Sequence, residues 1–407
     1  MLAAMPPTPP TSPESGESPI RDRGDACPGA LRLHPADDGR LARLRLPAGR
    51  LTVHQVEVLA AAAESLGDGR ITVTSRGNAE LRGLGDGCGA ELAALLADVG
   101  LLPSAEHERI RNIVASPAAD LDGLGGADVQ LWARELDALL CDEAWTTSLS
   151  GRFLFVLDDG RGDVAGLGGD VTLIAGADGT AQLHIGGQTY RLPAPDAPRA
   201  ALAAADAFLR AARTSGAWRV RELPDGAAVD LAAALARAGV TAEPLPVPPP
   251  LPHGAPPAPG ALGERAVYVL APLGRLTAAQ LRALLPADEV RLTPWRGAVA
   301  VGAPAARLPE LAAAGLIARP DSPWAGVSAC TGRPGCAKSL ADVRADAVPG
   351  GRTGLPVHYS GCARRCGHPH GDWVDVLAAE GGGYLVDGVP VPRTSLPEAV
   401  ATARTTR

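Results

Sequence analysis

The sequence predicts an α+β fold built from two pseudo-symmetric halves. Three observations support this prediction: a helix-start motif that occurs twice, a proline-rich segment between the two copies, and strand and helix patterns that mix in the same order in both halves. Such mixing is typical of α+β modules. With 407 residues the chain is long enough for two or three domains with cores of their own.

The repeated motif reads Gly-Arg-Leu-Thr, with a glutamine three residues after the threonine, and it occupies 49–55 and 274–280. At a helix start, the side chain of such a threonine accepts a hydrogen bond from the backbone N–H three residues on. The glutamine side chain in turn accepts from the backbone N–H of the threonine. We therefore expect helices to begin directly after Thr52 and Thr277.

Each copy of the motif is flanked by the same elements. A strand-like run precedes it, at 40–46 in the first half and 265–271 in the second, and a helix pattern rich in alanine and leucine follows. Next comes a strand that ends in a turn carrying an arginine, at 70–78 and 289–299. This repeated order predicts an internal duplication of the chain.

Two segments fall outside the halves. Residues 1–26 combine proline, serine and charged residues, which predicts a disordered tail, and they lack the apolar core of a secretory signal. Residues 243–264 are so rich in proline that they cannot continue a helix or a central strand, which predicts a semi-rigid linker.

Charge and hydropathy exclude two classes of partner. The formal net charge of −7 argues against nucleic acid, because a surface that binds phosphates is usually basic. No apolar stretch is long enough for a transmembrane helix, so we expect no membrane partner. These features predict a cytoplasmic protein, and in a reducing compartment a group of cysteines favours metal or redox chemistry over disulfides.

Four of the seven cysteines stand in two close pairs in the second half. Cys330 and Cys336 are separated by five residues, and Cys362 and Cys366 by three. Zinc sites usually have two residues between paired cysteines, whereas four thiolates from two loops suit a 4Fe-4S cluster. Glycines beside both pairs would let backbone N–H groups approach the cluster sulfurs. The spacing favours a 4Fe-4S cluster, with structural zinc and four unrelated cysteines as alternatives.

The cysteine pattern, on a duplicated scaffold with "VTSRGN" and "IRN" upstream, resembles the sulfite and nitrite reductase superfamily. Within it, "ACPGALRL", "LTPWRG" and above all "SGCARRCGHP" are most similar to the precorrin-3B synthase family of aerobic cobalamin biosynthesis. The resemblance implies two halves of the reductase type. Each half has a ferredoxin-like-half module, at 27–100 and 265–320, and a module of the cluster or sirohaem type, at 101–242 (without the cysteine motif) and 321–407.

The resemblance also implies roles for single residues. In the reductases the last cysteine of the motif bridges the cluster to sirohaem iron, and it matches Cys366. The arginine of their first strand-turn motif, which faces the tetrapyrrole and the bound anion, matches Arg76, and the arginine of their Arg-Asn motif matches Arg111. The expected catalytic set is Arg76, Arg111 and Arg152, and the same three bind the tetrapyrrole together with Arg296 and Cys366. The expected cluster ligands are Cys330, Cys336, Cys362 and Cys366.

One departure separates this chain from the reductases. They have two active-site lysines in a Lys-Phe-Lys stretch, where this chain has Arg152, Phe153 and Leu154. Arginine is a poorer proton donor than lysine because of its higher pKa, and leucine has no charge with which to hold a small anion. The departure argues against sulfite or nitrite reduction and leaves a binder of polycarboxylates intact. The alternative is that "RFLFVLDDG" is an ordinary buried strand, out of register with the reductases.

The resemblance further implies a mononuclear non-haem iron that handles dioxygen. His368 and His370 are candidate ligands because imidazole suits iron. Alternatively, they form hydrogen bonds to a cluster sulfur or pack a turn. The isolated cysteines, Cys27, Cys88 and Cys141, are predicted to be buried free thiols.

The expected activity is that of an oxidoreductase, more narrowly the dioxygen-dependent conversion of precorrin-3A to precorrin-3B. Expected partners are the tetrapyrrole substrate, dioxygen and an external electron donor. The donor would be NAD(P)H acting through a reductase, or a ferredoxin, because this chain has no dinucleotide-binding motif. The alternatives are a sirohaem-dependent sulfite or nitrite reductase and a non-catalytic iron–sulfur or zinc protein.

Overall fold

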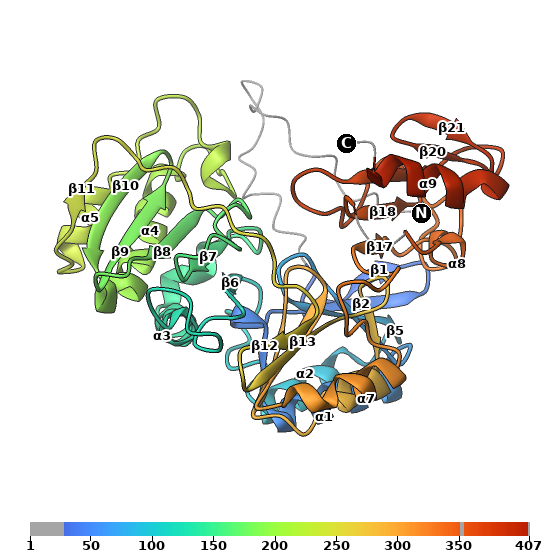
Figure 1. Cartoon of the computed structure of the whole chain (residues 1–407). Helices are drawn as coiled ribbons and strands as arrows, with labels where there is room; N and C mark the ends of the chain where they lie inside the picture. Colours follow the sequence, from blue (N-terminus) through green and yellow to red (C-terminus); the bar gives the residue numbers. More distant parts are fainter. Residues whose placement is uncertain (1–27, 351–353, 406–407) are drawn as a thin grey trace. The chain divides into compact units, whose positions relative to one another are not determined.

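The computed structural model describes residues 28–350 and 354–405. The tail predicted for 1–26 and Cys27 lie outside the described residues. Contacts within the chain define two compact units (Figure 1). Of the described residues, unit 1 comprises 106–119 and 124–255, and unit 2 comprises 28–105, 120–123, 256–350 and 354–405.

Unit 2 contains two five-stranded sheets that exchange strands between the halves of the sequence. β14 (Arg275–Thr277) of the second half pairs with β4 (Arg70–Val73) of the first, and β3 (Arg50–Leu51) pairs with β15 (Glu289–Leu292). Each copy of the repeated motif thus forms an edge strand of the other half's sheet. The strand order of the first sheet is β1-β2-β5-β4-β14, with β1 (His34–Ala36), β2 (Gly39–Leu44) and β5 (Ala79–Leu84). The strand order of the second sheet is β12-β13-β16-β15-β3, with β12 (Gly260–Leu262), β13 (Ala266–Leu270) and β16 (Gly297–Val301).

The arginines of the motif reinforce this exchange. Arg50 donates from Nε to the carboxylate of Glu289 over 3.0 Å. Arg275 forms the reciprocal ion pair with Asp68. Both pairs are partly buried, where screening by solvent is weaker than at the surface. The duplicated motif therefore holds the two ferredoxin-like sheets together by backbone and side-chain contacts alike.

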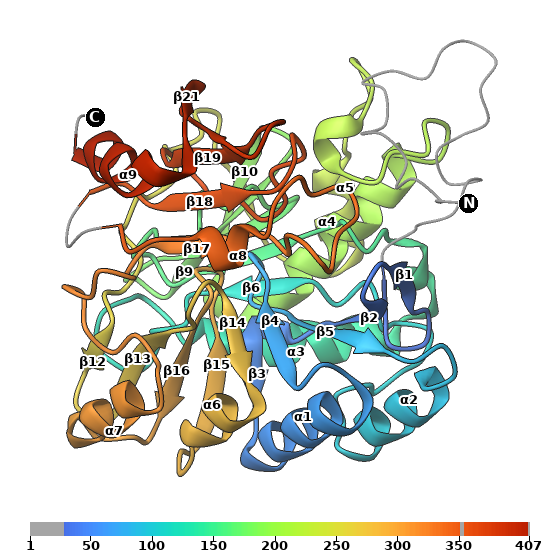
Figure 2. The same ribbon diagram turned by 90° about the vertical axis from the view of Figure 1, so that its right-hand side faces the viewer.

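Both predicted helix starts are confirmed. α1 (Val53–Leu66) follows Thr52, and α6 (Ala278–Ala283) follows Thr277. In each, the threonine Oγ1 accepts from the glutamine N–H, over 3.2 Å and 3.1 Å, and the glutamine Oε1 accepts from the threonine N–H. Figure 2 shows α1 and α6 side by side in a row with α2 (Gly89–Asp98) and α7 (Leu308–Ala313). Apolar residues of both halves form one core between these helices and the two sheets.

Unit 1 has a six-stranded sheet with the order β11-β10-β9-β8-β7-β6. β6 (Ile113–Ala115), β7 (Phe155–Asp158) and β8 (Val171–Ala175) are parallel, and β9 (Thr180–Ile185), β10 (Gln188–Pro193) and β11 (Glu243–Pro244) are antiparallel. The predicted linker begins at β11, on a sheet edge, where a proline is tolerated because its missing N–H breaks no ladder.

Helices complete unit 1. α3 (Val129–Asp142) connects β6 to β7 and buries Trp132, Leu136 and Leu140 as its apolar pattern predicts, while Leu139 is half-buried. α4 (Ala197–Ala211) packs on β8 and β9, and α5 (Leu231–Arg237) packs on α4.

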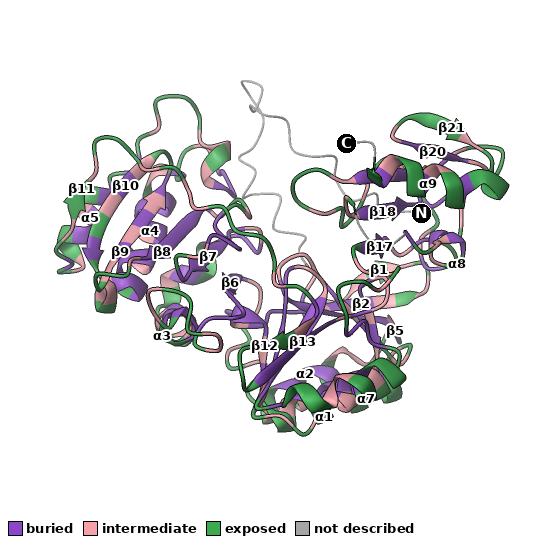
Figure 3. Cartoon of the chain, in the orientation of Figure 1, coloured by how far each residue is buried: buried purple, intermediate pink, exposed green. Residues whose placement is uncertain are grey.

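The third sheet of unit 2 repeats the strand directions of β6 to β10. β17 (Val327–Ala329), β18 (Val357–Ser360) and β19 (Val374–Ala378) are parallel, and β20 (Tyr384–Val386) and β21 (Val389–Val391) are antiparallel. α8 (Val343–Asp346) lies between β17 and β18, and α9 (Leu396–Thr405) packs on β19 and β20. Figure 3 shows the parallel strands as largely buried. The four sheets thus form two matching pairs, as the predicted α+β duplication requires. The residue bounds of the modules stay a prediction.

Candidate functional site

The four paired cysteines lie in two loops that follow neighbouring parallel strands of unit 2. Cys330 directly follows β17, and Cys362 follows β18 after Gly361. Because β17 and β18 pair in parallel, their C-terminal ends meet at one edge of the sheet. This is the usual position of ligand sites in sheets of this kind. The fold therefore brings together two cysteine pairs that are well separated in the sequence.

Backbone hydrogen bonds join the two loops. The N–H of Cys330 donates to the carbonyl of Tyr359 over 2.9 Å, and the N–H of Leu340 donates to the carbonyl of Gly361 over 2.8 Å. The N–H of Gly361 donates to Sγ of Cys330 over 3.3 Å. A Cβ at Gly361 would lie 1.8 Å from Oγ of Ser339, so the close approach requires glycine. The N–H of Gly361 thus reaches a cysteine sulfur, and the approach of glycine N–H groups to cluster sulfurs stays a prediction.

All four thiols are free. Burial raises the pKa of Cys330 and of Cys366, and the other three thiols of the group raise the pKa of Cys366 further. Among the described residues, no three of these sulfurs lie within 4.8 Å of one another. A tetrahedral zinc ion with bonds of about 2.3 Å would hold its thiolates about 3.8 Å apart. The four sulfurs are therefore not spaced as in a preformed tetrahedral zinc site.

Two arginines approach the cysteine loops. Arg296, in the turn between β15 and β16, donates from Nη2 to the carbonyl of Gly367. Arg344, in α8, donates to the carbonyls of Ala329 over 3.2 Å and Leu273 over 3.3 Å. Within the described ranges neither arginine forms an ion pair with a carboxylate. Both therefore place uncompensated positive charge near Cys330, where it favours thiolates over thiols.

The surroundings of these two guanidinium groups disfavour their positively charged form. Burial lowers the pKa of Arg296 to about 10 and that of Arg344 to about 9, and Arg275 adds to the effect on Arg344. Nε of Arg344 is buried without a hydrogen-bond partner in the described structure. An anionic group beside them would relieve this cost. Sequence analysis missed Arg344, because a single arginine in a short polar stretch forms no pattern.

Arg76 occupies the turn between β4 and β5 that corresponds to the turn of Arg296. The two turns touch, since a Cβ at Gly77 would lie 2.8 Å from the carbonyl oxygen of Leu292. Both arginines act on His370, whose pKa is lowered by partial burial, by His368 and by these two charges. The structure thus brings Arg76 and Arg296 to the same loop, and their shared role in binding a tetrapyrrole stays a prediction.

The candidate histidines form no preformed iron site. The exposed His368 stacks on Trp373 with 5.2 Å between ring centroids, and its Nδ1 lies 2.8 Å from the carbonyl oxygen of Pro369. In the described part of the chain, no histidine belongs to a group of three metal-ligand side chains. The mononuclear iron therefore stays a prediction of the resemblance.

A different histidine, His358, supports the cysteine loop and was missed by sequence analysis. It is fully buried in β18, and burial lowers its pKa to about 3, so the ring is neutral at physiological pH. Nε2 lies 3.0 Å from the carbonyl oxygen of Cys366, and Nδ1 lies 2.9 Å from Oγ of Ser328. Because a carbonyl only accepts, Nε2 carries the proton and donates to Cys366. His358 therefore fixes the position of the last cysteine.

Arg111 and Arg152 belong to unit 1. Arg111 is 5% exposed, and its Nε and Nη2 each donate to the carboxylate of Asp137 over 2.6 Å. The guanidinium of Arg152 lies over the ring of Trp218, 4.6 Å from the centroid. Arg76, Arg296 and the four paired cysteines belong to unit 2, so the joint action of the four arginines stays a prediction.

The two residues after Arg152 point into the core. Phe153 is fully buried against Phe155 and Phe208, with ring centroids 5.1 Å and 4.9 Å away. Leu154 is 3% exposed, and its N–H donates to Asp170 over 2.9 Å. This position therefore presents no polar group to a ligand.

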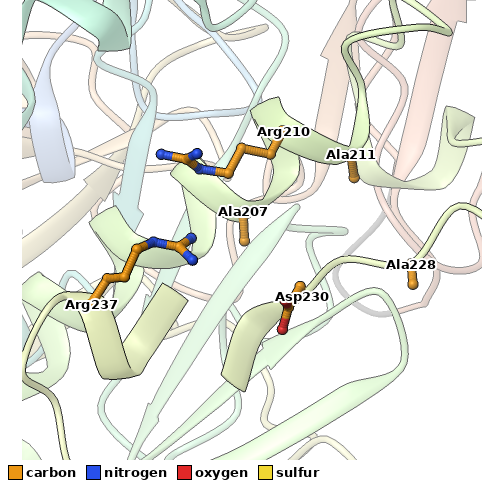
Figure 4. A pocket seen from close by; sticks show the side chains of 6 residues that line it. All are labelled: Ala207, Arg210, Ala211, Ala228, Asp230 and Arg237. Atoms are coloured by element: carbon orange, nitrogen blue, oxygen red, sulfur yellow. The ribbon is translucent and has the colours of Figure 1, made fainter. Parts of the chain in front are cut away.

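A surface recess on α4 and α5 is not part of this site. It is lined by Ala207, Arg210, Ala211, Ala228, Asp230 and Arg237 (Figure 4). Its two arginines are paired with Asp206, over 2.8 Å and 3.5 Å. No residue predicted for the functional site lies in the recess, and we assign no function to it.

Two further predictions can be compared with the structure. Cys88 and Cys141 are free, but they are half-buried rather than buried, because each stands near an end of a helix. Throughout the described ranges, no helix combines the length and apolar character needed to cross a membrane.

Comparisons with known proteins agree with this architecture. Residues 34–99 match the family described as the nitrite/sulfite reductase ferredoxin-like half domain. A Sinorhizobium protein named precorrin-3B synthase is 28% identical over 387 residues, which cover 90% of this chain and 83% of the relative. A ferredoxin–nitrite reductase of Synechococcus elongatus is 28% identical over 420 residues, which cover 88% of this chain and 80% of the relative.

The solved structure of the NirA protein of Mycobacterium tuberculosis has the same fold. It matches with a TM-score of 0.68 at 19% identity, over 88% of this chain and 79% of that one. The family match at 34–99 spans β1 to α2. This segment contains four of the five strands of the first ferredoxin-like sheet, β1, β2, β4 and β5, together with α1 and α2. These comparisons confirm the predicted fold and the resemblance to the nitrite and sulfite reductase superfamily.

Proposed function

We propose that the chain is an oxidoreductase of the precorrin-3B synthase type, which converts precorrin-3A to precorrin-3B with dioxygen. The relatives named precorrin-3B synthase and ferredoxin–nitrite reductase are equally similar to it, at 28% identity. Names alone thus leave two activities open. The choice between them rests on the two positions at which the reductases have active-site lysines.

Leu154 is the residue that favours the synthase activity over nitrite or sulfite reduction. In the reductases that the sequence resembles, this position holds the second of two lysines that grip a small anion. Here the side chain is apolar and 3% exposed, so it supplies neither charge nor proton. Arg152 remains, but its guanidinium is engaged by the ring of Trp218. A clamp with one cation missing is poorly suited to sulfite or nitrite.

Cys330, Cys336, Cys362 and Cys366 would hold a 4Fe-4S cluster. When bound, such a cluster supplies single electrons. Around it, the N–H of Gly361 would donate to the sulfur of Cys330, and Arg296 and Arg344 would contribute positive charge. Both effects favour the more negative, reduced state of a cluster. The neutral His358 would hold the carbonyl of Cys366 in place through its Nε2–H.

A tetrapyrrole precursor carries several acetate and propionate groups, so its site needs cations. We propose that Arg76 and Arg296 bind substrate carboxylates, since arginine pairs with carboxylates in a bidentate manner. Arg111 and Arg152 would contribute from unit 1. Arg111 would have to share its guanidinium with Asp137, which makes Arg152 the stronger candidate of the two.

Dioxygen is the proposed oxidant, and the electrons come from an external donor, either NAD(P)H through a reductase or a ferredoxin. The proposal includes a mononuclear non-haem iron only through the resemblance, and we assign no ligands to it. The second candidate function is sirohaem-dependent reduction of nitrite or sulfite, in which Cys366 would help to hold the haem. The Synechococcus relative, named as a nitrite reductase, favours this candidate.

The visible spectrum, together with iron and sulfide analysis of the purified chain, tests the cofactor. We expect a brown protein with about four irons and four sulfides per chain, the content of one 4Fe-4S cluster. Cys362→Ser should lower this content, whereas the matched control Cys88→Ser, a free half-buried cysteine outside the group, should not. Strong Soret and red bands would support sirohaem, and a colourless zinc protein would contradict both candidates.

A further inference from the structure

Unit 1 repeats the geometry of the cysteine loops with different side chains. Ser116 follows β6 as Cys330 follows β17, and its N–H donates to the neighbouring parallel strand, to the carbonyl of Leu157 over 3.0 Å. The N–H of Asp159, the first residue after β7, donates to Oγ of Ser116 over 3.2 Å. The N–H of Gly361, the first residue after β18, donates to Sγ of Cys330 over 3.3 Å. The loop after β7 is therefore the internal counterpart of the cysteine loop.

Three carboxylates occupy this counterpart position. Asp158, Asp159 and Asp163 each offer an oxygen, and these oxygens lie within 4.8 Å of one another. Asp158 and Asp159 are fully buried, and Asp163 is 7% exposed. Among the described residues, no other group of three metal-ligand side chains lies so close together. Three carboxylates at this distance repel one another unless a cation or a proton separates them.

Two of the three carboxylates have partners that shape the loop. Arg161 donates to both oxygens of Asp159, through Nε and Nη2. Asp158 accepts four backbone N–H groups over 2.8 to 3.0 Å, from Gly160, Gly162, Val164 and Ala165. These bonds fold the loop around the carboxylates. The proline-rich segment lies against the loop as well, since the N–H of Gly254 donates to the carbonyl of Gly162 over 2.9 Å.

Only one of the two carboxylate oxygens of Asp163 has a hydrogen-bond partner in the described structure. Its Oδ1 accepts from Oγ of Ser116 over 2.6 Å, but its Oδ2 is buried and has no partner in the described structure. A second buried acceptor beside Ser116 is in the same state. Gln130 donates from Nε2 to the carbonyl of Ser116 over 3.0 Å, while its Oε1 has no partner. Native structures rarely leave buried acceptors unpaired, and an unseen ion or water is a usual explanation.

The charge of the group matches a divalent ion. Three carboxylates and the guanidinium of Arg161 leave two negative charges when all groups are ionised. This excess negative charge is concentrated at one place, because an oxygen of each carboxylate lies within 4.8 Å of the others. The donor set consists of oxygens without imidazole or thiolate, and such sets select hard cations rather than iron or zinc.

We propose that the loop after β7 binds a hard divalent cation, of the Mg²⁺, Ca²⁺ and Mn²⁺ class, with Oδ2 of Asp163 as a direct ligand. Asp159 and Asp158 supply the remaining carboxylate charge. The second half holds its cysteine cluster at the C-terminal end of its parallel strands. The first half uses the equivalent end for an oxygen-ligated ion.

The test uses the full chain, treated with a chelator, desalted and titrated with Mn²⁺. The free aqueous ion gives a sharp electron paramagnetic resonance signal that is lost on binding. We expect one Mn²⁺ bound per chain and competition by Mg²⁺ or Ca²⁺. Asp163→Asn should weaken binding at least tenfold. The exposed Asp225→Asn, which removes the same charge elsewhere in unit 1, should bind like the unmodified chain.

A thermal unfolding measurement gives an independent readout on the unmodified chain. With the cation at about 100 times its dissociation constant, the midpoint should rise by about 5 °C relative to the chelated protein. Failure of Asp163→Asn to fold would leave this measurement decisive. If the unmodified chain binds no Mn²⁺ and its midpoint does not respond to any of the three ions, the proposal is wrong. Asp163 is then a protonated structural acid.

Discussion

The N–H of Gly361 donates to Sγ of Cys330, and the side chain of Ser339 fills the space that a Cβ at Gly361 would need. This contact links the loop of one cysteine pair to the loop of the other. It depends on the parallel pairing of β17 and β18, which places Gly361 one residue beyond a strand end and Cys330 directly after its neighbour. Replacement of Gly361 should therefore displace the cysteines of both loops.

We predict that Gly361→Ala destabilises the folded chain by about 1–3 kcal/mol through overpacking against Ser339. It should also lower the iron and sulfide retained after anaerobic reconstitution. Denaturant unfolding and iron analysis measure the two effects. Gly85→Ala is the matched control, because a Cβ there meets nothing within 4 Å. Equal iron content in both variants would show that the Gly361 contact is dispensable.

We predict that Leu154→Lys does not create a sulfite or nitrite reductase. A lysine at this buried position is an uncompensated charge, which should cost on the order of 3–5 kcal/mol of unfolding free energy. Leu154→Met should cost less than about 1.5 kcal/mol, because it conserves volume and polarity. Denaturant unfolding and an anaerobic assay with an artificial electron donor measure the outcome. A stable Leu154→Lys variant that reduces sulfite rapidly would contradict our account of this position.

Arg344 should tune the cluster rather than only hold the fold. Arg344→Met keeps most of the apolar stem but removes positive charge beside Cys330, so the reduction potential should fall. Arg344→Lys should restore part of the shift, because it restores the charge without the bonds to both carbonyls. Redox titration followed by spectroscopy measures the potential. The control is Arg319→Met, whose arginine side chain is 74% exposed. An unchanged potential in Arg344→Met would leave this arginine with a structural role only.

The stability of the cation-free chain should depend on Asp163 and on pH. Burial and the charges of Asp158 and Asp159 raise the pKa of Asp163 in the folded state to about 7, above its ordinary value of 3.8. The folded state therefore holds a proton that the unfolded state releases. Stability therefore falls as pH rises from about 4 to 7, and between pH 5 and 8 the loss attributable to Asp163 is on the order of 2–3 kcal/mol. The groups that face Asp163 are Asp158, Asp159, Arg161 and Ser116.

Unfolding in chelator at pH 5 and pH 8, for the unmodified chain and Asp163→Asn, measures this loss. Between pH 5 and pH 8, the variant should lose less unfolding free energy than the unmodified chain, because it lacks the titration of Asp163. A saturating divalent cation should remove the decline in the unmodified chain, because the ion favours the ionised carboxylate. If both proteins decline equally, Asp163 titrates near its ordinary range and the burial argument fails.

Local patterns in the sequence predicted local structure well. Thr52 and Thr277 cap helices because all the atoms of a capping box lie within four residues. The cysteine pairs could be predicted as candidate ligands because residue type and spacing carry the chemistry of such sites. Arg76 and Arg296 were predictable as turn residues from the duplication. In each case the signal lies inside a short segment.

Contacts between distant segments could not be predicted from the same patterns. The exchange of β3 and β14 depends on two or three residues pairing with the other half, and such short strands have no signature of their own. The pairing of Arg111 with Asp137, the burial of Leu154 and the support of Cys366 by His358 all require the tertiary fold. The group of Asp158, Asp159 and Asp163 was missed because its loop has the composition of an ordinary glycine-rich turn.

The conversion of precorrin-3A by the reconstituted chain tests the central claim most directly. The measurement combines the tetrapyrrole spectrum with the mass of the product formed under isotopically labelled dioxygen, in the presence of an electron donor. We predict a dioxygen-dependent spectral change with labelled oxygen in the product, and its loss in Arg296→Ala with the iron content unchanged. Rapid reduction of sulfite or nitrite by the unmodified chain, with no dioxygen-dependent change in the tetrapyrrole, would contradict the account and favour the reductase.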